Sequence, residues 1–379
     1  MPEKGELDDF DIDSMARRRV PCLVAYLHPF RLVNAPNSPA WDVSIDEVNQ
    51  SAWDYIALHE VVGALDVGLD APYNMVVCRD GAVAVPPLPG LRDDQQSVEF
   101  FNRCLAALLI GGIYCEAIAL DSLDFGSIID WKYLRVHSKA PAASNSFHRH
   151  VRLRQATPLE AISLLAPRSV TLKELSAAID VGRKVLNSVP EVSGEFLLKG
   201  VTGIARRDWG SALANLWIVV EQITTHMWTG QVLTAARQSK KITGRVEQLS
   251  DSRTWTIAAR HELLHQIGVL SHGVLEHLSN ARKARNDLSH KGKHPPASAA
   301  RSAYVATIDL LKIAAQSDSL PMLDIDLRNH QISDPFRPIE PEKIEPTYWM
   351  EIPKLPGELE LERLEAKHIR PHRSKTDSP

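Results

Sequence analysis

Several features that assign a protein to a class at once are scarce in this sequence. Its 379 residues include four cysteines, Cys22, Cys78, Cys104 and Cys115, and no two of them form a CxxC pair. This spacing excludes a zinc ribbon and a redox dithiol. We therefore expect the four thiols to be small buried apolar groups.

Long apolar runs are also lacking. The most apolar stretch, residues 104–120, contains Glu116 and is too short to span a bilayer comfortably. The first twenty residues carry acidic side chains where an export signal would have its apolar core. These observations predict a cytoplasmic protein without a membrane segment.

Charge of one sign is not in excess either. The net charge is −4, with 44% hydrophobic and 24% charged residues, which is typical of a soluble globular protein. Affinity for nucleic acid must therefore come from local basic patches. One is residues 282–294, with five Lys/Arg against Asp287 alone. In the other, residues 149–154, basic and apolar residues alternate, which favours a charged edge strand over an RNA contact.

The first 155 residues predict a mixed α+β region. An apolar run at residues 20–27 suits a buried strand, and residues 74–78 and 82–85 flank an Arg-Asp-Gly turn as a hairpin would. Helical spacing follows over residues 97–118. Residues 137–147 have the Ala/Ser/Pro composition of an exposed loop or linker.

From about residue 157 to 316 the pattern predicts helices only. Thr157 and Thr171 each begin a capping box, and Asp208 is the expected N-cap of a long helix. The apolar face of that helix is formed by Leu213, Leu216, Trp217, Val220, Thr224 and Met227. Further helices are expected over residues 254–267, 271–290 and 298–315, with short connections that favour an antiparallel bundle.

The predicted protein is therefore mainly α overall, with an α+β domain followed by an all-α bundle. Its parts are a disordered leader (1–19), the α+β domain (20–155), a helical connector (156–199), the helical bundle (200–316) and a Pro-rich charged tail (317–379). One short helix is expected in the tail, at residues 358–367.

Residues 261–265 read His-Glu-Leu-Leu-His, which matches the HExxH pattern of zinc proteases. Helical geometry argues against a metal site. Ile257, Leu263, Leu264 and Ile267 share one face, whereas His261 and His265 lie about 95° and about 135° from its centre. A solvated helix is favoured, with a zinc metalloprotease as the weaker alternative.

The helix predicted over residues 271–290 carries a second candidate site. Val274, Leu278, Ala281 and Leu288 form its apolar stripe, and Arg285 falls inside that stripe, where it needs an anion or an acidic partner. Asn286 and His290, four residues apart, share the adjoining flank. On spacing alone, an Arg285 that snorkels and a His290 that complements the helix dipole explain the pattern equally well.

Residues 281–292 resemble the signature of the HEPN domains, an all-helical superfamily found in bacterial toxins, defence systems and RNA-processing enzymes. That signature is an arginine followed by four to six residues and a histidine, usually with Asn, Asp or His after the arginine. Arg285, Asn286 and His290 fill these places. Glu221, on the helix that Asp208 caps, resembles the acidic residue that many such domains carry.

The resemblance implies a homodimeric, metal-independent endoribonuclease without a cofactor, in which two signature helices form one composite site. His290 would act as general base or acid, Arg285 would hold the scissile phosphate, and Asn286 would position one of them. Additional phosphate contacts would come from Arg282, Lys283, Lys291 and Lys293.

A toxin or antiviral defence role follows from the resemblance alone, and a non-catalytic RNA-binding or dimerisation module is the alternative. Under either function, the N-terminal domain is a candidate position for a regulatory protein or ligand.

Overall fold

The computed structural model describes residues 19–36, 39–91, 94–137, 143–238, 242–327 and 356–368. The chain divides into two units, Met1–Gln331 and Ile332–Pro379. In the second unit the described element is α16 (Pro356–His368), which includes the short helix expected there. Most of the predicted leader and tail lies outside the described residues. Of the leader the structure describes Arg19, and of the tail it describes residues 317–327 and 356–368.

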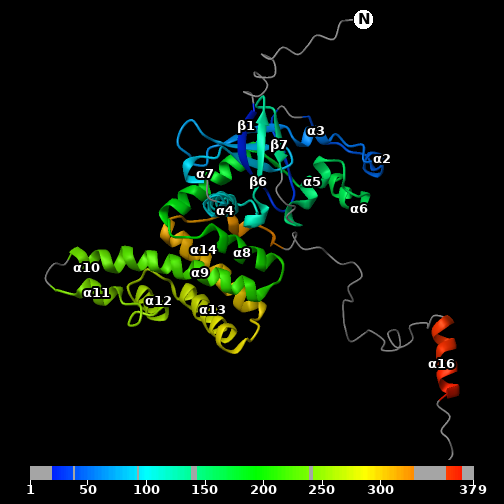
Figure 1. Cartoon of the computed structure of the whole chain (residues 1–379). Helices are drawn as coiled ribbons and strands as arrows, with labels where there is room; N and C mark the ends of the chain where they lie inside the picture. The colour runs from blue at the N-terminus through cyan, green and yellow to red at the C-terminus, as the bar shows by residue number, and fades with distance from the viewer. Residues whose placement is uncertain are drawn as a thin grey trace, which may run out of the picture. The chain divides into compact units, whose positions relative to one another are not determined.

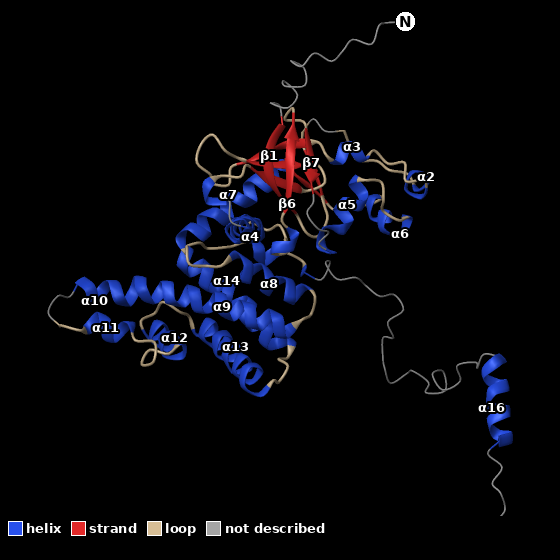
Figure 2. Cartoon of the chain, viewed as in Figure 1, coloured by secondary structure: helices blue, strands red, loops and turns tan. Residues whose placement is uncertain are grey.

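The chain is mainly helical, with a strand-rich N-terminal region and a helical C-terminal region, as the sequence predicts. Figures 1 and 2 show the strands at one end of the first unit and the long helices beneath them. The longer helices are α4 (Asp94–Ile110), α7 (Leu172–Ser188), α8 (Gly194–Ala205), α9 (Trp209–Trp228), α12 (Ile257–Gln266), α13 (His272–Lys291) and α14 (Ala297–Ala315). The shorter ones are α2 (Ile45–Asn49), α3 (Tyr55–Leu58), α5 (Ser146–Arg152), α6 (Pro158–Ala161), α10 (Thr234–Gln238) and α11 (Arg245–Ser250).

The strands form a six-stranded antiparallel sheet and a separate parallel pair. The large sheet has the order β3-β4-β5-β1-β6-β7. Its strands are β1 (Arg19–Tyr26), β3 (Val61–Leu65), β4 (Met75–Cys78), β5 (Ala82–Val85), β6 (Asp124–Ile129) and β7 (Tyr133–His137). The pair consists of β2 (Leu32–Asn34) and β8 (Ser169–Thr171). The buried strand and the hairpin expected from the sequence are β1 and β4–β5, so both predictions are confirmed.

The two edges of the large sheet meet. Tyr133 in β7 bridges Glu60, the residue before β3. On either side of this bridge, the Leu134 amide donates to the His59 carbonyl at 2.9 Å and the Val61 amide donates to the Lys132 carbonyl at 2.7 Å. The sheet thus closes into a small barrel, which removes the exposed edges that an open sheet would present.

Alternate side chains of the barrel strands fill its interior. Cys22, Val24 and Tyr26 of β1 lie there with Cys78 and Leu134 in one buried cluster. Burial raises the pKa of the Cys22 and Cys78 thiols to about 12. All four cysteines are free and buried, as expected, so they are packing residues.

The opposite face of the sheet belongs to the main core, which continues into the helices. Leu23 and Leu27 share this core with residues of α4, α7, α8, α9 and α14. Helices α4 and α7 cross with their backbones in contact at Gly182. A Cβ atom at this position would lie only 2.0 Å from the Ala107 carbonyl oxygen, so a larger residue would push the helices apart. The helices therefore rest directly on the barrel, and the division of the chain into functional domains stays a prediction.

A smaller cluster beside the barrel contains α5, where the predicted edge strand is wrong. Residues 146–152 form a helix, not the edge strand predicted at residues 149–154. In the described end of the predicted exposed loop, residues 143–147, Ala143 and Ser144 are exposed as expected, whereas Asn145 is fully buried. Local alternation suggested a strand, but packing with Trp53 and Leu58 selects a helix that buries Val151.

The helical region follows its capping signals closely. The Asp208 carboxylate accepts from the Ser211 amide at 3.0 Å at the start of α9, and the six residues of the predicted apolar face of α9 are all buried. The helix continues through a π-helical turn (Thr229–Leu233) into α10. Helix α14 begins and ends close to its predicted bounds and packs on α9 and α13.

Candidate functional site

Helix α13 carries the candidate signature. It begins after Ser271, whose hydroxyl accepts from the Val274 amide, and ends at Gly292, which has the left-handed conformation (φ 62°) that favours glycine. Val274, Leu278 and Ala281 are buried against the bundle. The predicted helix and its apolar stripe are therefore confirmed at these positions.

The three signature residues occupy the last turns of α13. Arg285 is half-buried and makes no ion pair with any carboxylate among the described residues. Its Nη1 instead donates to the Asn286 Oδ1 at 3.5 Å. Asn286 and His290 are exposed, and no hydrogen bond joins these two described side chains. In the single chain, the amide therefore contacts the arginine and leaves the imidazole free.

Glu221 lies on α9 and does not meet the signature within one chain. Its Oε1 accepts a hydrogen bond of 2.6 Å from the Trp217 Nε1, one helical turn away. Of the described residues, neither Arg285 nor His290 contacts this carboxylate. The structure thus assigns Glu221 a contact with Trp217, and its catalytic role stays a prediction.

The predicted phosphate contacts surround the signature. Lys283 and Lys293 are exposed, and Arg282 is half-buried on the side toward α12. Lys291 is exposed as well, but its Nζ lies 2.7 Å from the Asp287 carboxylate in an i,i+4 pair. An exposed pair of this kind is weak, so Lys291 can exchange Asp287 for a phosphate.

The HELLH string lies on α12 with a different face buried from the one predicted. Arg260, His261 and Leu264 are buried, whereas Ile267 is 51% exposed. The prediction failed because α12 packs on polar groups of α9: the His261 Nε2 lies 2.9 Å from the Thr224 Oγ1. His265 instead has its Nδ1 2.8 Å from the Leu270 carbonyl oxygen.

The two histidines thus have separate hydrogen-bond partners. Within the described ranges, no three His, Cys, Asp or Glu side chains cluster as metal ligands. The HExxH match therefore lacks the three-ligand geometry of a zinc protease.

A cavity of about 430 Å³ lies between α12 and α13. Its lining includes His261, Glu262, Ser279, Arg282 and Lys283. Burial, and next the positive charge of Arg282, lower the pKa of His261 to about 4. The imidazole is therefore neutral near pH 7.

A second cavity, also of about 430 Å³, lies on the other flank of α13, between this helix and the start of α14. Lys283, Asp287, Lys293 and His294 border it. Arg285, Asn286 and His290 line neither cavity; they lie on the open surface where α13 ends.

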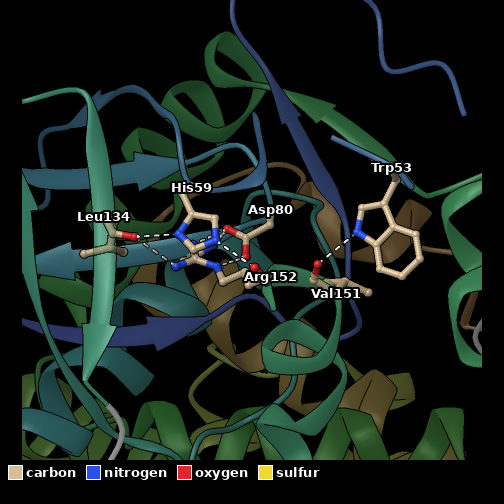
Figure 3. Close-up of polar contacts among 7 residues, drawn as sticks. Trp53, His59, Asp80, Leu134, Val151 and Arg152 are labelled. Atoms are coloured by element: carbon tan, nitrogen blue, oxygen red, sulfur yellow. Dashed lines mark hydrogen bonds and ion pairs between the residues drawn. The ribbon is translucent and has the colours of Figure 1, made fainter. Parts of the chain in front are cut away.

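In the second basic stretch of the sequence, residues 149–154, Arg152 is buried at one end of the barrel, whereas Leu153 and Arg154 are exposed. Arg152 donates from Nε and Nη2 to the two carboxylate oxygens of Asp80, at 2.5 and 2.7 Å (Figure 3). The His59 ring bridges the Leu134 and Arg152 carbonyl oxygens at 3.2 and 3.1 Å. Burial alone would raise the pKa of Asp80, but Arg152 outweighs it and holds this pKa below its usual value.

Arg152, Asp80 and His59 form a polar layer at this end of the barrel, and Arg149 and His148 extend it. The Arg149 Nη2 lies 3.1 Å from the Asp124 carboxylate. His148 packs among the rings of Tyr26, His28 and Phe30, and neither of its buried nitrogens has a hydrogen-bond partner of good geometry. Burial, and next the charge of His28, lower the pKa of His148 to about 3.

The sequence pattern does not predict these contacts, because nothing in a linear pattern pairs Arg152 with a residue 72 positions away. Two arginines of the stretch considered for RNA contact, Arg149 and Arg152, are instead directed at carboxylates, whereas Arg154 is exposed.

Comparison with known proteins adds no assignment: no protein-family model matches the sequence, and no curated protein and no solved structure is significantly similar to it. Of the helices in the described part of the chain, none is long and apolar enough to cross a membrane.

Proposed function

We propose that this protein is a metal-independent endoribonuclease of HEPN type that cleaves RNA at a site completed by a second copy of the chain. The observation that carries this proposal is the end of α13. There Arg285, Asn286 and His290 reach solvent beside Lys283 and Lys293, and Arg285 has no carboxylate partner among the described residues. An arginine with no carboxylate partner among the described residues, on the same helix as a solvent-facing imidazole, provides the groups for phosphate binding and proton transfer.

The reaction would be attack of a 2′-hydroxyl on the adjacent phosphate. The 2′ oxygen bonds to phosphorus while the bond to the 5′ oxygen breaks, which leaves a 2′,3′-cyclic phosphate and a 5′-hydroxyl. One imidazole accepts the 2′ proton, and another donates a proton to the leaving 5′ oxygen. The Arg285 guanidinium would offset the charge that develops on the phosphate oxygens.

Helical geometry explains why a second copy is needed. Arg285 and His290 are five residues apart, which separates their directions by about 140° around the axis of α13. One helix therefore cannot easily aim both side chains at the same phosphate. Two α13 helices meeting at their C-terminal ends would place the Arg285 of one copy beside the His290 of the other, and would supply two imidazoles.

A non-catalytic RNA-binding or dimerisation module is the second candidate. Its support is that the signature residues line neither cavity beside α13 in the single chain. For either candidate we also propose a toxin or defence role and a regulatory protein or ligand that binds at the barrel.

The test is cleavage of total RNA by the full chain, with analysis of the product ends. We expect cyclic phosphate and 5′-hydroxyl ends, no effect of a chelator, and loss of at least about a hundredfold in rate for Arg285→Ala and His290→Ala. Arg237→Ala, which removes an exposed arginine from α10, is the matched control. Equal cleavage by both signature variants and wild type would refute the site.

A further inference from the structure

The cavity between α12 and α13 leads along α13 to the signature. Ser279, Arg282, Asn286 and His290 follow one another at intervals of three or four residues, so they form one stripe along the helix. The first two line the cavity, and the last two lie beyond its end. Arg282 and Asn286 are one turn apart, about 6 Å along the axis. A ligand in this cavity can therefore extend to the proposed cleavage site.

Charge is distributed unevenly along the cavity. Arg282 and Lys283 line the end toward Asn286, whereas Glu276 lies nearly two turns earlier on α13, and Glu262 projects from α12. Cations at one end favour a phosphate group there. The Glu276 carboxylate at the other end repels phosphate and accepts hydrogen bonds from amino and hydroxyl groups. This order matches a nucleotide whose phosphate points toward the signature.

His261 forms part of the cavity lining and is held in place from behind. Its Nε2 lies 2.9 Å from the Thr224 Oγ1, and its ring stands edge-on to that of Trp217 with centroids 6.2 Å apart. Only 3% of His261 is exposed, and it lines the cavity. A neutral imidazole has one donor and one acceptor nitrogen. Thr224 uses Nε2, so Nδ1 is left to hydrogen-bond a ligand.

We propose that the α12/α13 cavity is a nucleotide subsite, in which Arg282 and Lys283 hold a phosphate adjacent to the scissile one and His261 contacts the base. The inference rests on the proposed function and deepens it by naming where the RNA strand binds. A volume of about 430 Å³ lies within the range of small-molecule sites. The HELLH string then supplies hydrogen-bonding groups to RNA.

The first test fills the cavity. Ser279→Trp places an indole in it, and Ser250→Trp makes the same change on exposed α11 as a control. Binding of a fluorescent 2′-O-methyl RNA oligonucleotide, which cannot be cleaved by 2′ attack, is measured by anisotropy with the full chain. We expect Ser279→Trp to weaken binding at least about tenfold and Ser250→Trp to bind as wild type does. Circular dichroism checks that both variants fold.

Cleavage kinetics separate this inference from the proposed function. If the subsite exists, Ser279→Trp raises KM about tenfold and changes kcat much less. If Ser279→Trp cleaves RNA with an unchanged KM, or binds the oligonucleotide as tightly as wild type does, the subsite is overturned but the nuclease is not. A third outcome is that the wild-type protein binds the oligonucleotide but cleaves no RNA, and that Ser279→Trp abolishes this binding. That outcome would support the subsite and overturn the nuclease. A wild-type protein that does not bind the oligonucleotide overturns the inference.

A second variant tests the role of His261. Thr224→Val removes the Nε2 partner while keeping the side-chain shape, so the imidazole is free to change its orientation and tautomer. We expect the relative affinities for 2′-O-methyl oligonucleotides of A, C, G and U to change. An equal change for all four bases would show that His261 does not contact the base.

Discussion

The two arginine-rich stretches of this chain differ in burial and in ion pairing. In residues 149–154, Arg149 and Arg152 are directed at carboxylates and Arg152 is only 3% exposed, whereas Arg154 is exposed. In residues 282–293, five cationic side chains are exposed or half-buried, and the one ion pair that they make with a described residue is the exposed Lys291–Asp287 pair. A similar composition therefore produces a structural layer at the barrel and an available surface on α13.

The difference shows what separates a structural arginine from a binding arginine. A buried guanidinium is stable only with a partner that replaces water, and Asp80 provides two oxygens for Arg152. Such a group has no capacity left for a ligand. Arg285 retains most of its donors, since its described contact is the 3.5 Å bond to Asn286.

The largest expected effect comes from breaking the barrel pair. Asp80→Ala leaves the Arg152 charge buried without a partner, which should lower the free energy of unfolding by about 3–5 kcal/mol. Urea denaturation measures this change. An Asp80→Ala/Arg152→Met double variant removes both charges and should recover part of the loss. A stability equal to wild type for Asp80→Ala would mean that the pair is not buried in solution.

Acid should destabilise the protein through His148 and His261, the two histidines that the described part of the structure buries almost completely. Burial lowers the pKa of His148 to about 3 and that of His261 to about 4, from 6.5. Below pH 6.5 the unfolded chain takes up protons that the folded chain excludes, so stability falls as the pH drops from 6.5 toward 4. Each histidine should account for about 2 kcal/mol between pH 7 and pH 5.

Urea midpoints at pH 7 and pH 5 measure this loss. His148→Phe, which suits the surrounding rings of Tyr26 and Phe30, should remove its share of the pH dependence. An unchanged slope in this variant would show that His148 is protonated in the folded protein.

The smallest effect is expected on α13. Lys293→Ala removes an exposed cation that has no described ion pair, and should change stability by less than about 0.5 kcal/mol. In RNA binding it should reduce the slope of log affinity against log salt by about 0.7–0.9. Titrations from low to moderate salt measure this slope. A slope equal to that of wild type would mean that Lys293 contacts no phosphate.

The helices of the bundle could be predicted from the sequence, because their ends depend on neighbouring residues. Asp208 caps α9 through Ser211, and Ser271 and Gly292 bound α13. The order of Arg285, Asn286 and His290 along one helix followed from the same local rules. Alternation predicted a strand where α5 forms, and helical phase predicted the wrong buried face of α12.

These failures share a physical cause. Hydrogen bonds between residues three or four positions apart can be deduced from the order of the chain, and they determined the caps, the hairpin turn and the basic end of α13. The contacts that bury Arg152 and His261 join them to Asp80 and Thr224, 72 and 37 positions away. Only packing brings such groups together, so the tertiary structure alone decided which arginines are neutralised inside the protein and which can bind a phosphate.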